Sequence, residues 1–144
     1  MINKTMLFIG LSVAVTLTSV VKADTIFSCE TANNKKIEVK DLGNHIEYRF
    51  GRHLKKPELV ISVLREQAST WQWNGVGREM SYSVTIPNGE VNYIVFASME
   101  RFTEEHSTSS GVIIEDNQQL VTTVYCLSDT LVQSLEGIDL KKSD

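Results

Sequence analysis

The sequence predicts an all-β fold: a single-domain antiparallel β-sandwich or partly open barrel of about eight strands, with a short C-terminal helix or tail and one disulfide. Three observations support this fold class. Apolar and polar residues alternate in several short runs, which is the pattern of strands that bury one face. Turn-forming residues separate these runs at short intervals. No long stretch has the periodicity of an amphipathic helix.

An apolar segment precedes the predicted domain. Residues 6–21 carry no charge and follow Lys4, and Ala23 ends a small-residue cleavage site. We therefore expect residues 1–23 to form a signal peptide and residues 24–144 to form an exported domain. A membrane anchor is the alternative, because the segment is only slightly shorter than a spanning helix. The polar sequence directly after Ala23 favours cleavage.

The exported domain is acidic. The chain has 14 basic and 18 acidic residues, for a formal net charge of −4. The leader contains two of the lysines and no acid, so the remaining 121 of the 144 residues have a net charge of −6. Because this charge repels phosphate groups, we expect no nucleic acid and no anionic membrane surface as partner. Basic proteins are better partners.

Both cysteines of the chain, Cys29 and Cys126, lie in the exported domain. In an oxidising compartment two cysteines pair by default, which predicts a disulfide between them. The bond would close a loop through most of the domain and stabilise it by on the order of 4 to 5 kcal/mol. A metal site is the alternative, but two cysteines and three scattered histidines lack the ligand spacing of zinc sites.

The first half of the domain is predicted to contain four strands. The polar residues 31–34 form a turn that joins the first two strands into a hairpin. In the third strand, Ile46, Tyr48 and Phe50 alternate with charged residues, which indicates one solvated face. The four strands are predicted at residues 25–30, 35–41, 46–50 and 59–64.

The second half begins with residues 65–70, which are polar and predict either a loop or one helical turn. Met80, Tyr82, Val84 and Ile86 then alternate with serine and threonine, which predicts an amphipathic strand. A Pro-Asn-Gly turn follows and joins this strand to the next in a hairpin. The strands of this half are predicted at residues 80–86, 91–99, 111–115 and 120–126.

The charged, serine-rich residues 100–110 are predicted to be a connection between two of these strands. After the last strand the alternation ends, and Leu131, Val132 and Leu135 have helical spacing. This spacing predicts either a short C-terminal helix or a packed tail.

No catalytic or cofactor motif is present. The chain has no G-x-S-x-G, H-E-x-x-H or CxxC sequence and no P-loop. Gly75 and Gly77 faintly resemble a phosphate-binding loop, but they lead into a strand, and we expect them to form a tight corner. Glu104, Glu105 and His106 are usual residues of a solvated loop. We therefore expect neither an enzyme nor a bound metal or cofactor.

Trp71 and Trp73 are two residues apart, so on an extended segment both side chains face the same side. They are either core residues or an exposed aromatic patch beside Arg78. Aromatic residues and arginine dominate the energetics of many protein interfaces, because they bury a large area and keep a polar group. The same two rings are also suited to stacking on sugars. The residues alone leave these alternatives open.

Three segments of this acidic, exported β-domain resemble a known family: WNGVGR (73–78), SYSV (81–84) and FTEEHSTSSGV (102–112). With the single disulfide, they resemble the small periplasmic immunity proteins that accompany type VI secretion effectors. The likeness is greatest to the dimeric immunity proteins directed against VgrG-type effectors with a lysozyme-like, peptidoglycan-cleaving domain. It covers most of the exported domain in layout. The short inhibitory motif of the periplasmic lysozyme inhibitors is absent.

This resemblance implies a periplasmic homodimer that binds a secreted muramidase-type effector and occludes its active-site cleft. An acidic inhibitor is steered toward such an enzyme when the enzyme is basic. The alternative function is a secreted carbohydrate-binding module that uses Trp71 and Trp73. The residues expected to contact the effector are Trp71, Trp73, Arg78, Glu104, Glu105 and Glu136.

Overall fold

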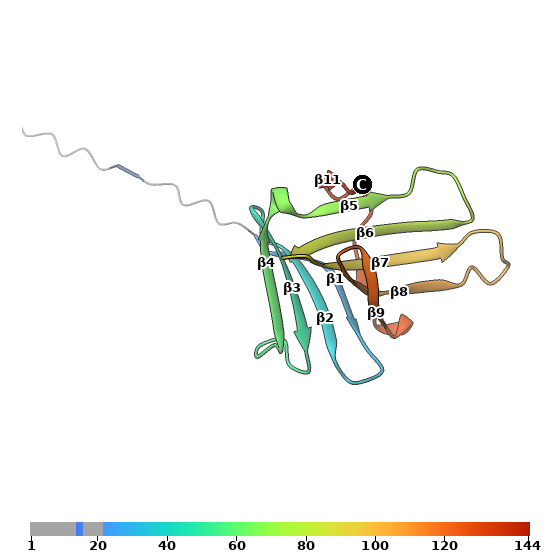
Figure 1. Ribbon diagram of the computed structural model, residues 1–144, viewed down its shortest axis with the longest axis horizontal. Coiled ribbons are helices and arrows are strands. Elements are labelled where there is room, and N and C mark those ends of the chain that lie inside the picture. The colour runs from blue at the N-terminus through green and yellow to red at the C-terminus, as the bar shows by residue number, and fades with distance from the viewer. Residues whose placement is uncertain (1–13, 16–21) are drawn as a thin grey trace, which may run out of the picture.

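Two β-sheets pack face to face in the computed structural model, which describes residues 14–15 and 22–144 (Figure 1). Most of the predicted signal peptide lies outside the described residues. Within them, eleven strands pair antiparallel, except for the last one, which runs parallel to its neighbour. The two sheets share no strand and do not close into a barrel. The prediction of an all-β sandwich is confirmed.

The two sheets divide the chain almost in sequence order. Sheet 1 has the order β10-β1-β2-β3-β4, and sheet 2 has the order β11-β5-β6-β7-β8-β9. The strands of sheet 1 are β1 (Asp24–Glu30), β2 (Lys36–Asp41), β3 (His45–Gly51), β4 (Leu59–Leu64) and β10 (Val132–Gln133). Those of sheet 2 are β5 (Ser69–Gln72), β6 (Glu79–Asn88), β7 (Val91–Glu100), β8 (Thr108–Asp116), β9 (Gln119–Tyr125) and β11 (Lys141–Lys142).

The core lies between the inner faces of the sheets. Val84 and Ile86 of β6 are fully buried, as the alternation of β6 predicts. On the facing sheet Ile46 and Tyr48 of β3 are buried as well. The ring centroids of Tyr48 and Tyr93 lie 5.3 Å apart across the interface. Burying each large apolar side chain stabilises the fold by about 1.5 to 3 kcal/mol. The packing of the two apolar inner faces therefore holds the sheets together as a sandwich.

The predicted disulfide between Cys29 and Cys126 is present. Cys29 belongs to β1, and Cys126 comes directly after β9, so the bond joins sheet 1 to sheet 2. The two Cα atoms are 5.6 Å apart, and 97 residues separate the cysteines in sequence. Thr31 and Cys126 also form an isolated antiparallel bridge beside the disulfide. The first strand and the end of the last long strand are therefore held together at one side of the sandwich.

Strand bounds in the second half differ from the prediction at several places. Pro87 and Asn88, predicted as turn residues, belong to β6, so the hairpin turn is formed by Gly89 and Glu90. Residues 65–70 form a 3₁₀ turn, η1 (Arg65–Gln67), and then enter β5, a strand that was not predicted. A strand of four residues is too short for its alternation to be recognised in the sequence, and β5 is defined by its pairing with β6. Strand β8 begins at Thr108, because Ser109 and Ser110 pair with β7. The connection between β7 and β8 is therefore shorter than predicted.

The C-terminal segment is a packed tail, and the alternative of a short helix is wrong. Beyond the 3₁₀ turn η2 (Ser128–Thr130), the described chain has no helix. Leu135 is fully buried, and Leu131, Ile138 and Leu140 pack against the core. These side chains reach the core from a non-helical backbone with a turn at Glu136 and Gly137. The segment is bound to β1, since the amide of Ser134 donates to the carbonyl of Ile26 over 2.9 Å. Their spacing therefore did not require a helix.

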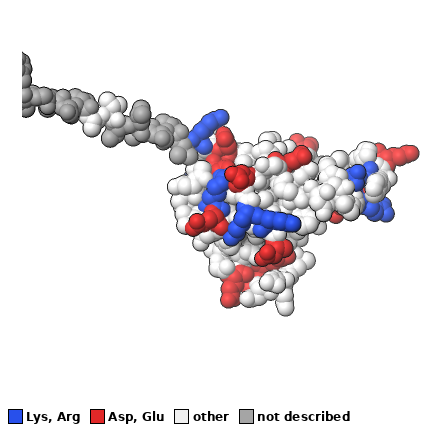
Figure 2. All heavy atoms as spheres, turned by 90° about the horizontal axis from the view of Figure 1, so that it is seen from above, with Lys and Arg blue, Asp and Glu red and all other residues white. Residues whose placement is uncertain are grey.

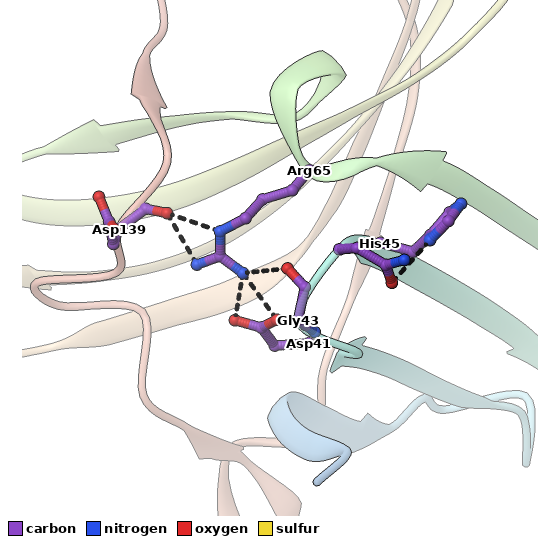
Figure 3. A network of polar contacts seen from close by, with 6 residues as sticks. Asp41, Gly43, His45, Arg65 and Asp139 are labelled. Atoms are coloured by element: carbon purple, nitrogen blue, oxygen red, sulfur yellow. Dashed lines mark hydrogen bonds and ion pairs between the residues drawn. The ribbon is translucent and has the colours of Figure 1, made fainter. Parts of the chain in front are cut away.

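Arg65 connects the tail to sheet 1 (Figure 3). Its Nη1 donates to both carboxylate oxygens of Asp41, over 2.7 and 2.8 Å, and to the carbonyl of Gly43 over 3.1 Å. Its Nε and Nη2 donate to the carbonyl of Asp139, over 3.1 and 2.7 Å. All three nitrogens of the guanidinium are thus used inside the protein. This cluster is structural, because it leaves no nitrogen of the guanidinium free for a ligand.

Candidate functional site

Two loops meet at one end of sheet 2 and form a protrusion that we call the tip, residues 73–78 and 101–107. In Figure 1, β6, β7 and β8 run beyond sheet 1 toward these loops. The amide of Arg101 donates to the carbonyl of Arg78 over 2.8 Å, and its Nη1 donates to the carbonyl of Gly77 over 3.0 Å. The guanidinium carbon lies 4.5 Å from the centroid of a Trp73 ring. Arg101 therefore fixes one loop against the other.

The first loop of the tip is a tight corner, as predicted. Trp73 donates from Nε1 to the carbonyl of Val76 over 2.9 Å, and the amide of Val76 donates to the Asn74 side chain over 3.1 Å. Gly75 and Gly77 have φ angles of +88° and +98°, which other residues adopt only with strain. These contacts give the loop a defined shape.

The surface of the tip combines large apolar side chains with charges of both signs. Val76 is 75% exposed and Phe102 is 65% exposed. Glu104 and Glu105 are exposed on the second loop. The Arg78 side chain is exposed, and its Nε lies 3.4 Å from a carboxylate oxygen of Glu100. Figure 2 shows basic and acidic side chains together at the right-hand end, where the tip lies.

Four of the six predicted contact residues come together in the tip: Trp73, Arg78, Glu104 and Glu105. Trp71 lies in β5 and is 39% exposed, opposite Ser83 on the face of sheet 2 that points away from sheet 1. Neither tryptophan is a core residue, so that alternative is wrong.

Glu136 lies apart from the tip, in the C-terminal tail. One of its carboxylate oxygens accepts a hydrogen bond from the Tyr82 hydroxyl over 3.1 Å. Partial burial, together with this hydrogen bond, raises the pKa of Tyr82. The two residues line a hollow of about 360 Å³ beneath sheet 2, with Met80, Met99 and Leu131. The sequence alone could not show that Glu136 lies on a different surface from Glu104 and Glu105.

Three residues of the tip were missed by the sequence analysis: Val76, Arg101 and Phe102. Single exposed apolar residues are common on protein surfaces, so Val76 and Phe102 become informative only when the fold brings their loops together. Arg101 gives no signal in the sequence, since its role depends on a contact with a loop 28 residues earlier. That contact exists only in the folded chain.

No known protein family, curated protein or solved structure matches this chain. Within residues 14–15 and 22–144, no three His, Cys, Asp or Glu side chains form a group that could hold a metal ion. Among the same residues, no helix is both long and apolar enough to cross a membrane.

Proposed function

We propose that this protein is a periplasmic immunity protein that binds a secreted, peptidoglycan-cleaving muramidase and blocks its active-site cleft with the tip. The observation that carries the proposal is the pair of exposed apolar side chains, Val76 and Phe102, on two loops fixed to each other. Apolar side chains exposed together mark many protein interaction sites, and a protruding pair of loops has a shape that can enter a cleft. The protein acts by occupying the site, without turnover.

The tip suits this task because its shape is set before binding. Arg101 joins both loops through two hydrogen bonds to backbone carbonyls and a cation–π contact with Trp73. A loop that is already ordered loses less entropy when it binds, and more of the contact energy remains as affinity.

The charges of the tip are also complementary to such an enzyme. Glycoside hydrolases act through a pair of carboxyl groups in the cleft, and the exposed guanidinium of Arg78 can pair with one of them. Glu104 and Glu105 then face the rim, where an enzyme that binds the anionic wall is basic. The net charge of −6 on the exported domain accelerates this encounter at low salt.

The test uses a lysozyme-like effector of the VgrG type and measures its hydrolysis of purified peptidoglycan. The exported domain should inhibit at one-to-one stoichiometry, and Phe102→Ala and Arg78→Glu should each weaken inhibition by at least about tenfold. Val132→Ala is the matched control, because Val132 is 64% exposed on β10, outside the tip. Circular dichroism checks that each variant is folded. Full inhibition by both tip variants, or none by the unchanged protein, would contradict the proposal.

We also propose that the protein is a homodimer in which two β9 strands pair edge to edge. Strand β9 lies at the edge of sheet 2 and contains neither a charge nor a proline, the residues that usually protect such edges. Leu120 and Val121 are 66% and 60% exposed there. Antiparallel pairing of two copies is symmetric about a twofold axis, so it closes after two subunits.

A further inference from the structure

The outer face of sheet 2 points away from sheet 1 and carries a row of aromatic side chains. Successive strand pairings place Trp71, Ser83, Phe96, Gly111 and Tyr125 side by side across β5, β6, β7, β8 and β9. Residues of the inner face alternate with them along each strand. Trp71 is 39% and Tyr125 is 61% exposed, so two of the three rings are open to solvent.

Gly111 determines the spacing within this row. Its φ is +156°, and a Cβ atom there would lie 2.2 Å from the carbonyl oxygen of Val124. No side chain therefore separates Phe96 from Tyr125, and their rings meet edge to face with centroids 6.4 Å apart. The rings of Phe96 and Tyr125 therefore contact each other directly over the position of Gly111.

Hydroxyl groups lie next to the aromatic row. Ser81, Ser98 and Ser109 are paired neighbours on β6, β7 and β8. With Ser83 and the rings of Phe96 and Tyr125, they line a hollow of about 380 Å³.

A second hollow, of about 670 Å³, adjoins the first on the same face. Ile94 lines the second and Ile113 lines the first, and these two residues pair across β7 and β8. The second hollow is lined by charges of both signs, including Lys141 and Lys142, so its chemistry differs from that of the first.

The chemistry of the first hollow favours a neutral, polyhydroxylated ligand. Its lining has no lysine or arginine, and its one charged residue, Glu79, repels anions. Sugar rings stack their C–H faces on aromatic rings, and their hydroxyl groups exchange hydrogen bonds with serine side chains. Trp71 lies two strands from Phe96, about 10 Å between backbones, while the Phe96 and Tyr125 rings contact each other. The interval between Trp71 and this ring pair matches a disaccharide of an extended β-linked chain.

We propose that the outer face of sheet 2 binds a neutral β-linked glycan chain, with Trp71, Phe96 and Tyr125 as stacking residues. The site differs from the paired tryptophans expected from sequence, because Trp73 is held in the tip by Arg101. It does not depend on the function proposed for the tip.

The test titrates the exported domain with chitotetraose and cellotetraose, by calorimetry and by amide chemical shifts. At least one of the two glycans should bind and shift amides of β6 to β9. Tyr125→Ala and Trp71→Ala should each weaken binding by at least about tenfold, because each removes one stacking contact. Tyr125 is 61% exposed, so Tyr125→Ala should keep the melting temperature of the unchanged protein. Circular dichroism checks that Trp71→Ala is folded.

Phe102→Ala in the tip is the matched control and should bind the glycan with unchanged affinity. The same variant should weaken muramidase inhibition, so the two proposals fail independently. If neither glycan binds, or if both face variants bind as well as the unchanged protein, the outer face is not a glycan site.

Discussion

At the scale of single residues, Tyr48 shows how the core constrains a titratable group. Its side chain is only 1% exposed and contacts Tyr93 across the sandwich. Burial, followed by the neighbouring Tyr93, raises the pKa of the Tyr48 phenol above its usual value. The neutral form is therefore favoured in the folded protein, while the unfolded chain titrates normally.

This difference predicts a loss of stability in alkali. Below about pH 10, the usual pKa of tyrosine, Tyr48 is protonated in both the folded and the unfolded state, and its full contribution to the free energy of unfolding is present. Above it, the unfolded chain binds fewer protons, so the free energy of unfolding falls by up to about 1.4 kcal/mol per pH unit until the folded group titrates. Urea unfolding at pH 9 and pH 11 should show this loss, and Tyr48→Phe should reduce it. An equal pH dependence in both proteins would argue against the mechanism.

At the scale of elements, β6 and β5 show what a sequence can predict. The apolar residues of β6 recur at every second position over a long strand, and burial of Val84 and Ile86 follows directly. Strand β5 has four residues, and β11 has two, which pair with β5. Such short strands are defined by the strands that they pair with. Because these partners are distant in sequence, a local pattern does not predict the short strands. The same limit applies to the contact of Arg101 with Trp73.

The edge strand β9 carries a prediction of its own. Val121→Lys places a charge in an exposed edge and should convert the proposed homodimer to a monomer, with little change in the stability of each subunit. Light scattering coupled to size-exclusion chromatography measures the mass directly. Val76→Lys, on the tip, is the control and should leave the mass unchanged. If the unchanged protein is a monomer, edge pairing through β9 does not occur.

At the scale of the whole molecule, the disulfide and the tail hold the two sheets together. The pairing of Cys29 with Cys126 was predictable because two cysteines in an oxidising compartment have one partner each. The position of the tip was not, because loops 73–78 and 101–107 meet through tertiary contacts. Four of the six predicted contact residues lie there, while Trp71 and Glu136 occupy other surfaces.

Removing the disulfide should cost most of a small domain's stability. Cys29→Ala with Cys126→Ala frees a loop of 97 residues in the unfolded state and should lower the free energy of unfolding by about 4 kcal/mol. Urea unfolding measures this change. Reduction of the unchanged protein with dithiothreitol should reproduce it, and an unaltered midpoint in both experiments would contradict the entropic account.

The tip has a further consequence for how this protein can evolve. Its exposed residues, such as Val76 and Phe102, contribute nothing to the core, while the shape of the loops depends on Gly75, Gly77 and Arg101. Surface substitutions away from such features usually change stability by less than about 0.5 kcal/mol. Related chains can therefore exchange the exposed residues without loss of stability, while the residues that shape the loops are retained.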